Sequence, residues 1–517
     1  MQVKTEQDEI QSFLRDASNS AGGRAERVLV PETAEEAAAA LAEAARAGTP
    51  VTVSGAGTGV VGGRVPEGGI VLSTHRLSRV VDVEREGTGG RAVAQAGVVL
   101  GDLQRAARAA GLFYPPDPTE WSCFVGGSVA TNASGARTFK YGPARRYVRR
   151  VQAALTTGDL LDLRRGECVA DASGLLRVPA GGGRVIEARL PSYRMPATRK
   201  HAAGYYVEPG ADAVDLLVGS EGTLGVITEV ELSLLSLPAG VLSGVVFFDS
   251  EEGLLAFVRE ARSRSLETRA LAAAGAAGAG AEGLDARALE YFDKESLMFL
   301  RERYPLVPGG AAGAVFFEQE IDERTEDALL GAWTDLLERH GALADSSWFG
   351  TGEADRAEMS AFRHALPVMV NEWLARHGQR KVSTDMAVPD AAFPRMLAFY
   401  HETLRARRLK YVIFGHVGDN HVHVNILPRD GAEAAAAREV YGSFVRQAVA
   451  LGGTISAEHG VGKLKRAYLR ELYGDGHLRE MAALKRAFDP ARVLGRGNIF
   501  GEDILDAVAR TSGAGGA

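Results

Sequence analysis

The sequence predicts an α+β protein with two domains, and two observations carry this prediction. Strand-like and helix-like patterns alternate between about residues 28 and 235, and after Pro238 a second series of apolar runs begins, separated by long helical segments. The length of 517 residues also suits two or three domains of ordinary size. We therefore expect the following division of the chain: domains at residues 1–237 and 238–455, a further segment at 456–507 and a flexible tail at 508–517.

The first predicted element is a helix. Thr33 is followed three residues later by Glu36, which is typical of a capping box, and the helix should extend to about Arg46. After it, short apolar runs predict four strands and one amphipathic pattern predicts a helix: strands at 50–54, 70–73, 80–83 and 92–96, and a helix at 100–110. The second domain repeats such runs around an Ala/Gly-rich stretch that we expect to be a loop: strands at 245–248, 314–317, 382–388, 411–414 and 422–427, and the loop at 272–283.

The composition excludes several classes of protein. The chain has 59 basic and 66 acidic residues and a net charge of -7, so it lacks the positive field that nucleic-acid binding requires. Cys123 and Cys168 are too few for a disulfide framework. Residues 1–20 show no signal-peptide pattern, and no stretch approaches the ~18 apolar residues of a membrane span. We expect a cytoplasmic protein without a transmembrane segment, with peripheral membrane contact left open.

Glycine is in excess, at 62 of 517 residues, which is about 12% against a usual ~7%. Gly57, Gly59 and Gly62 match the dinucleotide fingerprint G-x-G-x-x-G, and Asp82 follows at the distance expected of a ribose-binding acid. That fingerprint must open a helix, whereas Pro66 and a new predicted strand follow here. We therefore disfavour a Rossmann fold. A loop so rich in glycine can instead turn backbone N–H groups toward an anion.

Three further segments share the character of the loop at 54–63: residues 114–118, 126–135 with 140–142, and 218–228. In this order, the four segments resemble the FAD-binding domain of vanillyl-alcohol-oxidase-type flavoproteins over residues 28 to 235. The resemblance implies three groups of FAD contacts: Gly55, Ala56, Gly57, Thr58 and Gly59 at the pyrophosphate; Pro116, Asp117, Gly126, Gly127, Thr131, Asn132 and Ser134 at the flavin and ribityl chain; and Glu221, Gly222 and Ile227 near the adenosine and isoalloxazine. The loop at 54–63 contains no His or Cys, so we expect FAD to be bound non-covalently.

Histidines gather in the second half of the chain. His416 and His423 flank a predicted hairpin loop at 418–421, and the register expected for that hairpin places them opposite each other, with Asn425 on the same face. The segment 456–462 adds a turn that carries Glu458 and His459. Two histidines and a carboxylate are typical of a catalytic divalent-metal site, in which zinc is common. The alternative is that these histidines are surface or hydrogen-bonded groups.

The pattern H-x-G-D-x-x-x-H-x-N followed by E-H-G-x-G resembles the carboxy-terminal domain of FAD-linked D-2-hydroxyacid dehydrogenases, a group that includes D-lactate, D-2-hydroxyglutarate and glycolate dehydrogenases. The resemblance implies that His416, His423 and Glu458 bind the metal, with zinc expected first and manganese or iron as alternatives. It makes His459 the general base and Asn425 a substrate contact. One departure is that this chain reads Gly418-Asp419-Asn420-His421 where relatives usually read Gly-Asp-Gly-Asn. His421 could then compete as a metal ligand, or line the pocket and contact the substrate.

A 2-hydroxy acid also needs a cation for its carboxylate, and arginine suits this role because its planar fork matches two oxygens. In the family, this arginine lies on the helix before an S/T-x-D-x-x-x-P strand, which is residues 383–389 here. Arg363 is therefore the candidate, and Lys381 is a second one. The segment 488–500 resembles the family's closing segment, which returns to the flavin domain and would bring Asn498 to the cofactor.

Taken together, the resemblance implies a two-subdomain FAD-binding domain of the vanillyl-alcohol-oxidase type and an α+β substrate, or cap, domain with an antiparallel sheet. The expected reaction is oxidation of a D-2-hydroxy acid, such as D-lactate, to the 2-oxo acid, with the hydride passing to flavin N5. A quinone, a cytochrome or an electron-transfer flavoprotein would accept the electrons, and a homodimer is one assembly to test. Three alternatives stay open: an oxygen-using alcohol or sugar oxidase, a non-redox flavoenzyme like the ether-lipid synthases, and a non-enzymatic flavin- or metal-binding protein.

Overall fold

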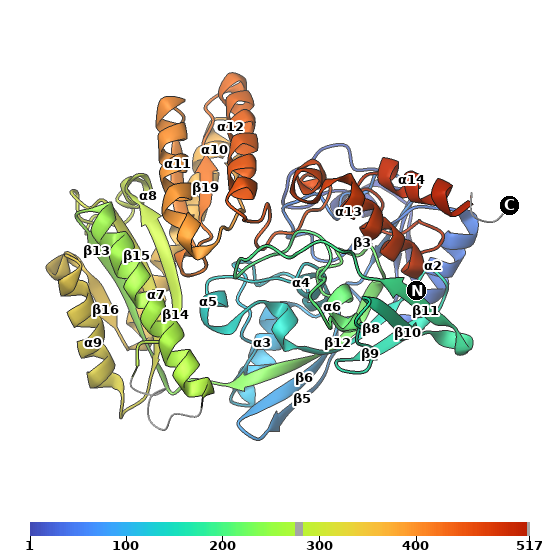
Figure 1. Ribbon diagram of the computed structural model, residues 1–517, viewed down its shortest axis with the longest axis horizontal. Coiled ribbons are helices and arrows are strands. Elements are labelled where there is room, and N and C mark those ends of the chain that lie inside the picture. The colour runs from blue at the N-terminus through green and yellow to red at the C-terminus, as the bar shows by residue number, and fades with distance from the viewer. Residues whose placement is uncertain (275–282, 514–517) are drawn as a thin grey trace.

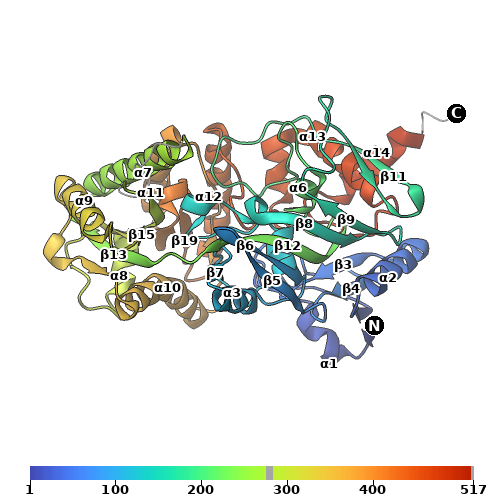
Figure 2. The same ribbon diagram turned by 90° about the horizontal axis from the view of Figure 1, so that it is seen from below.

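The computed structural model describes residues 1–274 and 283–513 of the chain. Three large sheets and their helices form an elongated molecule, with α9 (Glu326–Arg339) at one end and α2 (Ala34–Ala47) and α14 (Glu502–Gly513) at the other (Figures 1 and 2). This arrangement confirms the predicted α+β class. The division of the chain into domains residue by residue stays a prediction.

The first sheet holds the amino-terminal part of the chain. Its strands lie in the order β1 (Gln2–Lys4), β2 (Arg27–Val30), β4 (Ile70–Ser73) and β3 (Val51–Ser54), and β2, β4 and β3 are parallel. Helix α2 begins at the predicted cap, where the Glu36 backbone N–H donates to Thr33 Oγ1 at 3.2 Å. The second half of the capping box is absent because the Glu36 carboxylate accepts the N–H of Glu32 instead. No helix lies between β3 and β4, as expected for a loop that is not a Rossmann fingerprint.

The second sheet is antiparallel throughout and is built around one long central strand. Its order is β5 (Val80–Glu86), β6 (Gly89–Gln95), β12 (Val226–Ser236), β8 (Val148–Ala154) and β9 (Leu160–Arg164), with β7 (Leu112–Phe113) also paired to β12. Short elements connect and cover these strands: α3 (Leu100–Ala109), α4 (Val125–Ala130), α5 (Thr138–Tyr141), α6 (Ala213–Leu217) and the hairpin of β10 (Leu175–Pro179) and β11 (Val185–Arg189).

The third sheet has seven antiparallel strands, which confirms the predicted antiparallel cap sheet. Its order is β16 (Trp348–Gly350), β13 (Gly240–Phe248), β15 (Gly313–Ile321), β14 (Ala286–Asp293), β18 (Tyr411–Gly415), β19 (His423–Ile426) and β17 (Val382–Ser383). Six helices accompany it: α7 (Glu251–Ala273), α8 (Lys294–Leu300), α9, α10 (Glu353–Arg376), α11 (Phe393–Ala406) and α12 (Gly431–Ala450).

Two predictions about this sheet are wrong. The predicted strand 382–388 ends at Ser383, because the following residues leave the sheet and Ala387 bridges His421 and Thr454 instead. The predicted hairpin register also fails: His423 pairs with Phe414, not with His416. Gly415, at φ +128°, ends β18, and a 3₁₀ turn at Val417–Asp419 follows. His416 therefore lies in the connecting loop rather than in a strand.

The carboxy-terminal segment returns to the first sheet. After α12 the chain forms α13 (Arg466–Phe488), and the strand β3 then hydrogen-bonds to the segment that follows: Val51 N–H donates to Val493 O, and Gly495 N–H donates to Val51 O, both at 2.8 Å. Figure 1 shows α13 and α14 on the same side as α2 and β3. Helix α14 extends to Gly513, so the predicted tail is helical there, and residues 514–517 lie outside the described residues.

Two further predictions concern the Ala/Gly-rich loop and membrane-spanning helices. The predicted Ala/Gly loop begins inside α7, which extends to Ala273, and residues 275–282 lie outside the described part of the chain. Among the described residues, no helix combines the length and the apolar character that crossing a membrane requires.

Candidate active site

A cavity of about 360 Å³ lies where the glycine-rich segments meet. Most of the residues predicted to contact FAD line it: Gly55, Ala56, Gly57, Thr58, Gly59, Gly126, Gly127, Thr131, Ser134, Glu221, Gly222 and Ile227. Asp16 and Arg64, which the sequence did not single out, line it as well, and so do Glu458 and His459. Four segments that are far apart in the chain thus share one cavity, as the resemblance implies for a cofactor site.

The backbone of this cavity suits an extended, anionic cofactor. A Cβ added at Gly59 or Gly127 would meet no atom within 4 Å, so glycine keeps these walls open to a ligand. Gly57, at φ +87°, adopts a conformation that favours glycine. Gly126 has a different reason, because a Cβ there would come within 2.5 Å of Ala96 Cβ. The residues present therefore fit FAD, with open glycines on the cavity side and a packing glycine behind them.

Four predicted cofactor residues do not line the cavity. Pro116 and Asp117 come just before Pro118, which does line the cavity, and Asp117 Oδ2 lies 3.4 Å from Arg137 Nη1. The Asn132 side chain accepts the backbone N–H of Arg145. Asn498 Nδ2 donates to the carbonyls of Gly63 and Glu221 at 3.0 and 3.2 Å. Asn498 thus ties two segments next to the cavity together, and its direct contact with FAD stays a prediction.

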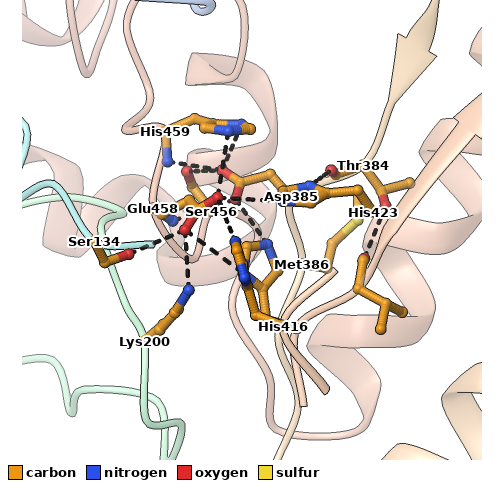
Figure 3. A network of polar contacts seen from close by, with 12 residues as sticks. Ser134, Lys200, Thr384, Asp385, Met386, His416, His423, Ser456, Glu458 and His459 are labelled. Atoms are coloured by element: carbon orange, nitrogen blue, oxygen red, sulfur yellow. Dashed lines mark hydrogen bonds and ion pairs between the residues drawn. The ribbon is translucent and has the colours of Figure 1, made fainter. Parts of the chain in front are cut away.

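Glu458 lines this cavity and also contacts His416, His423 and His459, and we call these four residues the histidine cluster (Figure 3). Its Oε1 lies 3.3 Å from His416 Nε2, 3.2 Å from His423 Nε2 and 3.6 Å from His459 Nε2. Its Oε2 accepts hydrogen bonds from Ser134 Oγ at 3.1 Å and Lys200 Nζ at 3.0 Å. One carboxylate oxygen therefore faces the imidazoles, and the other is held by the flavin-binding part of the chain.

The remaining nitrogens of His416 and His423 are held from behind. His416 Nδ1 lies 2.6 Å from Glu290 Oε1, and His423 Nδ1 lies 2.9 Å from the carbonyl oxygen of Thr384. Such outer partners fix the ring orientation and tautomer of metal-ligating histidines. Although the predicted hairpin register is wrong, the two rings do converge, with centroids 5.5 Å apart. The donor set of two oriented imidazoles and a carboxylate fits a divalent metal.

Charge in this cluster is strongly organised. Burial opposes ionisation of Glu458, but Lys200 and His416 outweigh it and hold the pKa of this carboxyl well below its usual range. Burial also opposes the protonation of His416, yet the carboxylates of Glu290 and Glu458 raise its pKa to about 9. These carboxylates thus favour a positive charge on the His416 ring. A metal that binds there would have to displace the proton.

His459, the predicted general base, lies next to Glu458 at the cavity. Burial lowers its pKa to about 4 although Asp385 and Glu458 oppose this shift, so the ring is neutral at pH 7. Its side chain is 31% exposed, and it lines the cavity. His459 Nδ1 lies 3.5 Å from Asp385 Oδ2, so the nitrogen opposite faces the cluster. The ring is therefore neutral and partly accessible from the cavity, and its role as the base stays a prediction.

Asp385 is a buried carboxylate that holds the turn carrying Glu458 and His459 in place. It accepts hydrogen bonds from Ser456 Oγ and Lys465 Nζ, both at 2.6 Å, and from the backbone N–H groups of Glu458 and His459. Burial opposes its ionisation, but His459 and Lys465 keep its pKa well below the usual range. In the sequence, Asp385 is distinguished only as the acidic residue of the S/T-x-D-x-x-x-P motif at 383–389. The structure shows that it anchors the Glu458–His459 turn.

The predicted substrate residues lie in different surroundings. Arg363, on α10, donates from Nε to Glu290 Oε2 at 3.1 Å, so it is one residue removed from His416. Asn425 is 1% exposed and follows His423 on β19. Lys381 is exposed just before β17. His421 has no exposed surface, and neither it nor Arg363, Lys381 or Asn425 is among the residues that line the cavity.

Comparisons with known proteins agree with these observations. Residues 25–164 match the family described as FAD binding domain, and residues 259–499 match that described as FAD linked oxidases, C-terminal domain. A D-lactate dehydrogenase of Anaerostipes hadrus is 30% identical over 516 residues, which cover 95% of this chain and 93% of that enzyme. The chain belongs to the FAD-linked D-2-hydroxyacid dehydrogenases.

Two further comparisons concern a second curated relative and a solved structure with the same fold. The glycolate oxidase subunit GlcD of Bacillus subtilis is 27% identical over 502 residues, covering 95% of this chain and 92% of that protein. A solved alkyldihydroxyacetonephosphate synthase shares its fold, with a TM-score of 0.65 at 14% identity, covering 96% of this chain and 82% of that one. The histidine cluster of the dehydrogenase falls within residues 259–499. Lys200 and Glu221 lie between the two matched regions.

Proposed function

We propose that the chain oxidises a D-2-hydroxy acid, such as D-lactate, to the 2-oxo acid, using non-covalently bound FAD and a divalent metal held by His416, His423 and Glu458. The observation that carries this proposal is that Glu458 and His459 belong both to the cavity lining and to the histidine cluster. A substrate beside them would face the flavin cavity and the metal donors at once. Relatives named D-lactate dehydrogenase and glycolate oxidase support this substrate class.

FAD, when bound, supplies the acceptor for the hydride from C2 of the substrate, and the metal supplies a Lewis acid that favours the ionised hydroxyl. The side chains do the rest. His459 takes up the hydroxyl proton at Nε2, the nitrogen that faces Glu458 Oε1 at 3.6 Å. Asp385, 3.5 Å from Nδ1, then stabilises the positive ring, as expected of a carboxylate that orients a general base.

The substrate carboxylate is assigned to Arg363. Glu290 accepts a hydrogen bond from Arg363 Nε and so orients the guanidinium. The other oxygen of Glu290 contacts His416, so the same carboxylate links Arg363 to the histidine cluster. The resemblance makes Asn425, two residues after His423 on the same strand, the polar contact for the bound acid; because it is 1% exposed and does not line the cavity, it would reach substrate only after a rearrangement. Lys381 is the second candidate for the carboxylate, and its exposed position makes it the weaker one. Electron transfer to a quinone, a cytochrome or an electron-transfer flavoprotein, a cytoplasmic location and a homodimer remain predictions.

The proposal is tested by anaerobic bleaching of the flavin with a panel of D- and L-2-hydroxy acids. Protein treated with a chelator but still full of FAD is compared with the same protein after addition of zinc or manganese. We expect bleaching by D-acids only, and only with metal restored. An unchanged rate in the metal-free protein would contradict the metal mechanism. No bleaching by any 2-hydroxy acid would contradict the substrate class and favour a non-redox or binding role.

A further inference from the structure

His421 is the histidine in which this chain departs from the family pattern, and its surroundings are unusual. The side chain has no exposed surface. Neither of its ring nitrogens has a hydrogen-bond partner among the described residues, and Nδ1 lies 4.0 Å from Glu458 Oε2. Buried polar atoms are nearly always satisfied, so a bare nitrogen that faces a buried carboxylate needs an explanation.

The local backbone brings His421 to this position. Its N–H donates to the carbonyl oxygen of His416 at 3.2 Å, which closes the loop between β18 and β19. Asn420, before it, adopts φ +52°, a left-handed conformation that asparagine tolerates. As a result, the His421 ring lies 5.4 Å from the His416 ring and 4.5 Å from the His423 ring.

His421 is oriented in the same way as the two predicted ligands. Each of the three rings has an oxygen near the nitrogen that faces away from Glu458. Glu290 Oε1 and the Thr384 carbonyl are within hydrogen-bond reach of His416 and His423, whereas Asp385 Oδ1 lies 3.1 Å from His421 Nε2 as a close charged neighbour without a hydrogen bond. Metal-ligating histidines almost always have such a partner. The ligand atoms of His416, His421, His423 and Glu458 all lie within 4.8 Å of one another.

The other role predicted for His421, contact with substrate, finds no support in this geometry. A residue without exposed surface that is absent from the cavity lining meets substrate only after rearrangement. A purely structural histidine would be expected to satisfy both ring nitrogens. Coordination accounts for the bare Nδ1, the orientation of the ring and its place among the ligand atoms together.

We propose that His421 is a fourth protein ligand of the divalent metal, which this chain holds with three imidazoles and one carboxylate. This inference rests on the proposed function, because that function places the metal here. A third imidazole makes the donor set richer in nitrogen. Imidazole suits zinc, whereas manganese prefers oxygen ligands. His421 is therefore expected to bias the site toward zinc.

The test compares His421→Asn, the residue type of the family pattern, with His401→Asn as a matched control. His401 is also buried and lies beside Tyr411, outside the cluster. Dissociation constants for zinc and manganese are measured by competition with a chelator, on protein with full FAD content. For His421→Asn we expect the zinc constant to rise about tenfold or more and the manganese constant to rise less, with both constants unchanged in the control.

A second measurement does not depend on the folding of a His421 variant. Pulsed electron paramagnetic resonance of Cu²⁺-loaded protein counts the coordinated imidazoles, and a His459→Asn background prevents the base from being counted. Three imidazoles would support the proposal, and two would overturn it. An unchanged zinc constant in His421→Asn would also overturn it while leaving the proposed function intact. If the unaltered protein binds no stoichiometric metal, the metal mechanism itself fails.

Discussion

Glu290→Gln should weaken metal binding although Glu290 is not itself a proposed metal ligand. The carboxylate lies 2.6 Å from His416 Nδ1, and its other oxygen accepts from Arg363 Nε at 3.1 Å. Burial opposes its ionisation, but His416 and Arg363 lower its pKa to about 2, so it is charged at pH 7. Glutamine keeps the shape and removes the charge that makes His416 a better ligand.

The expected size follows from this position. Loss of an outer partner of a metal-ligating histidine typically costs 10–100-fold in metal affinity, which is about 1.4–2.7 kcal/mol. The substitution also leaves Arg363 without its buried partner, and breaking a buried ion pair costs about 3–5 kcal/mol of stability. The assay therefore measures the zinc dissociation constant by chelator competition, at a temperature where unfolding curves show the variant fully folded.

Glu318→Gln is the matched control for this prediction. Glu318 lies on the neighbouring strand β15, is held by Arg137 at 3.1 Å and Arg287 at 3.6 Å, and has its pKa lowered to about 2 by these two arginines despite burial. It does not touch His416. We expect it to lose stability but not metal affinity. Equal loss of zinc affinity in both variants, or none in Glu290→Gln, would refute the reasoning.

The remaining predictions concern four other side chains. His459→Asn should slow flavin reduction by D-lactate by about 10²–10⁴ with FAD content unchanged, measured by anaerobic stopped flow; loss of FAD instead would make His459 structural. Arg363→Ala should raise KM for 2-hydroxy acids far more than Arg376→Ala, an exposed control at the end of the same helix; equal KM values would move the role to Lys381. The pKa of His416 is raised to about 9, so a proton competes with the metal for this ring below that pH. Metal affinity should therefore rise up to about tenfold per pH unit between pH 6 and 8, and calorimetry in two buffers should show proton release on metal binding. Burial lowers the pKa of His201 to about 4 from 6.5, so the unfolded chain binds more protons between these values and stability should fall with falling pH there, by at most about 3 kcal/mol; unfolding curves of His201→Gln should lack that loss.

Local patterns account for what the sequence could predict. The glycine loop, the His416 to Asn425 segment and the Glu458–His459 turn are short runs whose residue types suffice to indicate their chemistry, and their elements are mostly near the predicted positions. Strand β14 escaped detection because Arg287, Glu290 and Asp293 interrupt its apolar character although every residue in it is buried. The sequence therefore could not reveal Glu290, the partner of His416. The hairpin register failed for a similar reason, since the 3₁₀ turn after Gly415 changes which residues face each other.

The coupling between the two halves of the site was beyond sequence reasoning altogether, because it depends on contacts across long separations. Ser134 and Lys200 both donate to Glu458 Oε2, from 324 and 258 residues away in the chain. Ser134 also lines the cavity. Lys200 Nζ donates to the carbonyl oxygen of Gly135, the residue after Ser134, at 3.0 Å. A single carboxylate thus joins the flavin-binding part to the histidine cluster. One oxygen of Glu458 is held by Ser134 and Lys200, and the other faces the imidazoles. Glu458 thus fixes the position of the predicted metal donors relative to the cofactor cavity, which is the placement that the proposed hydride transfer would need.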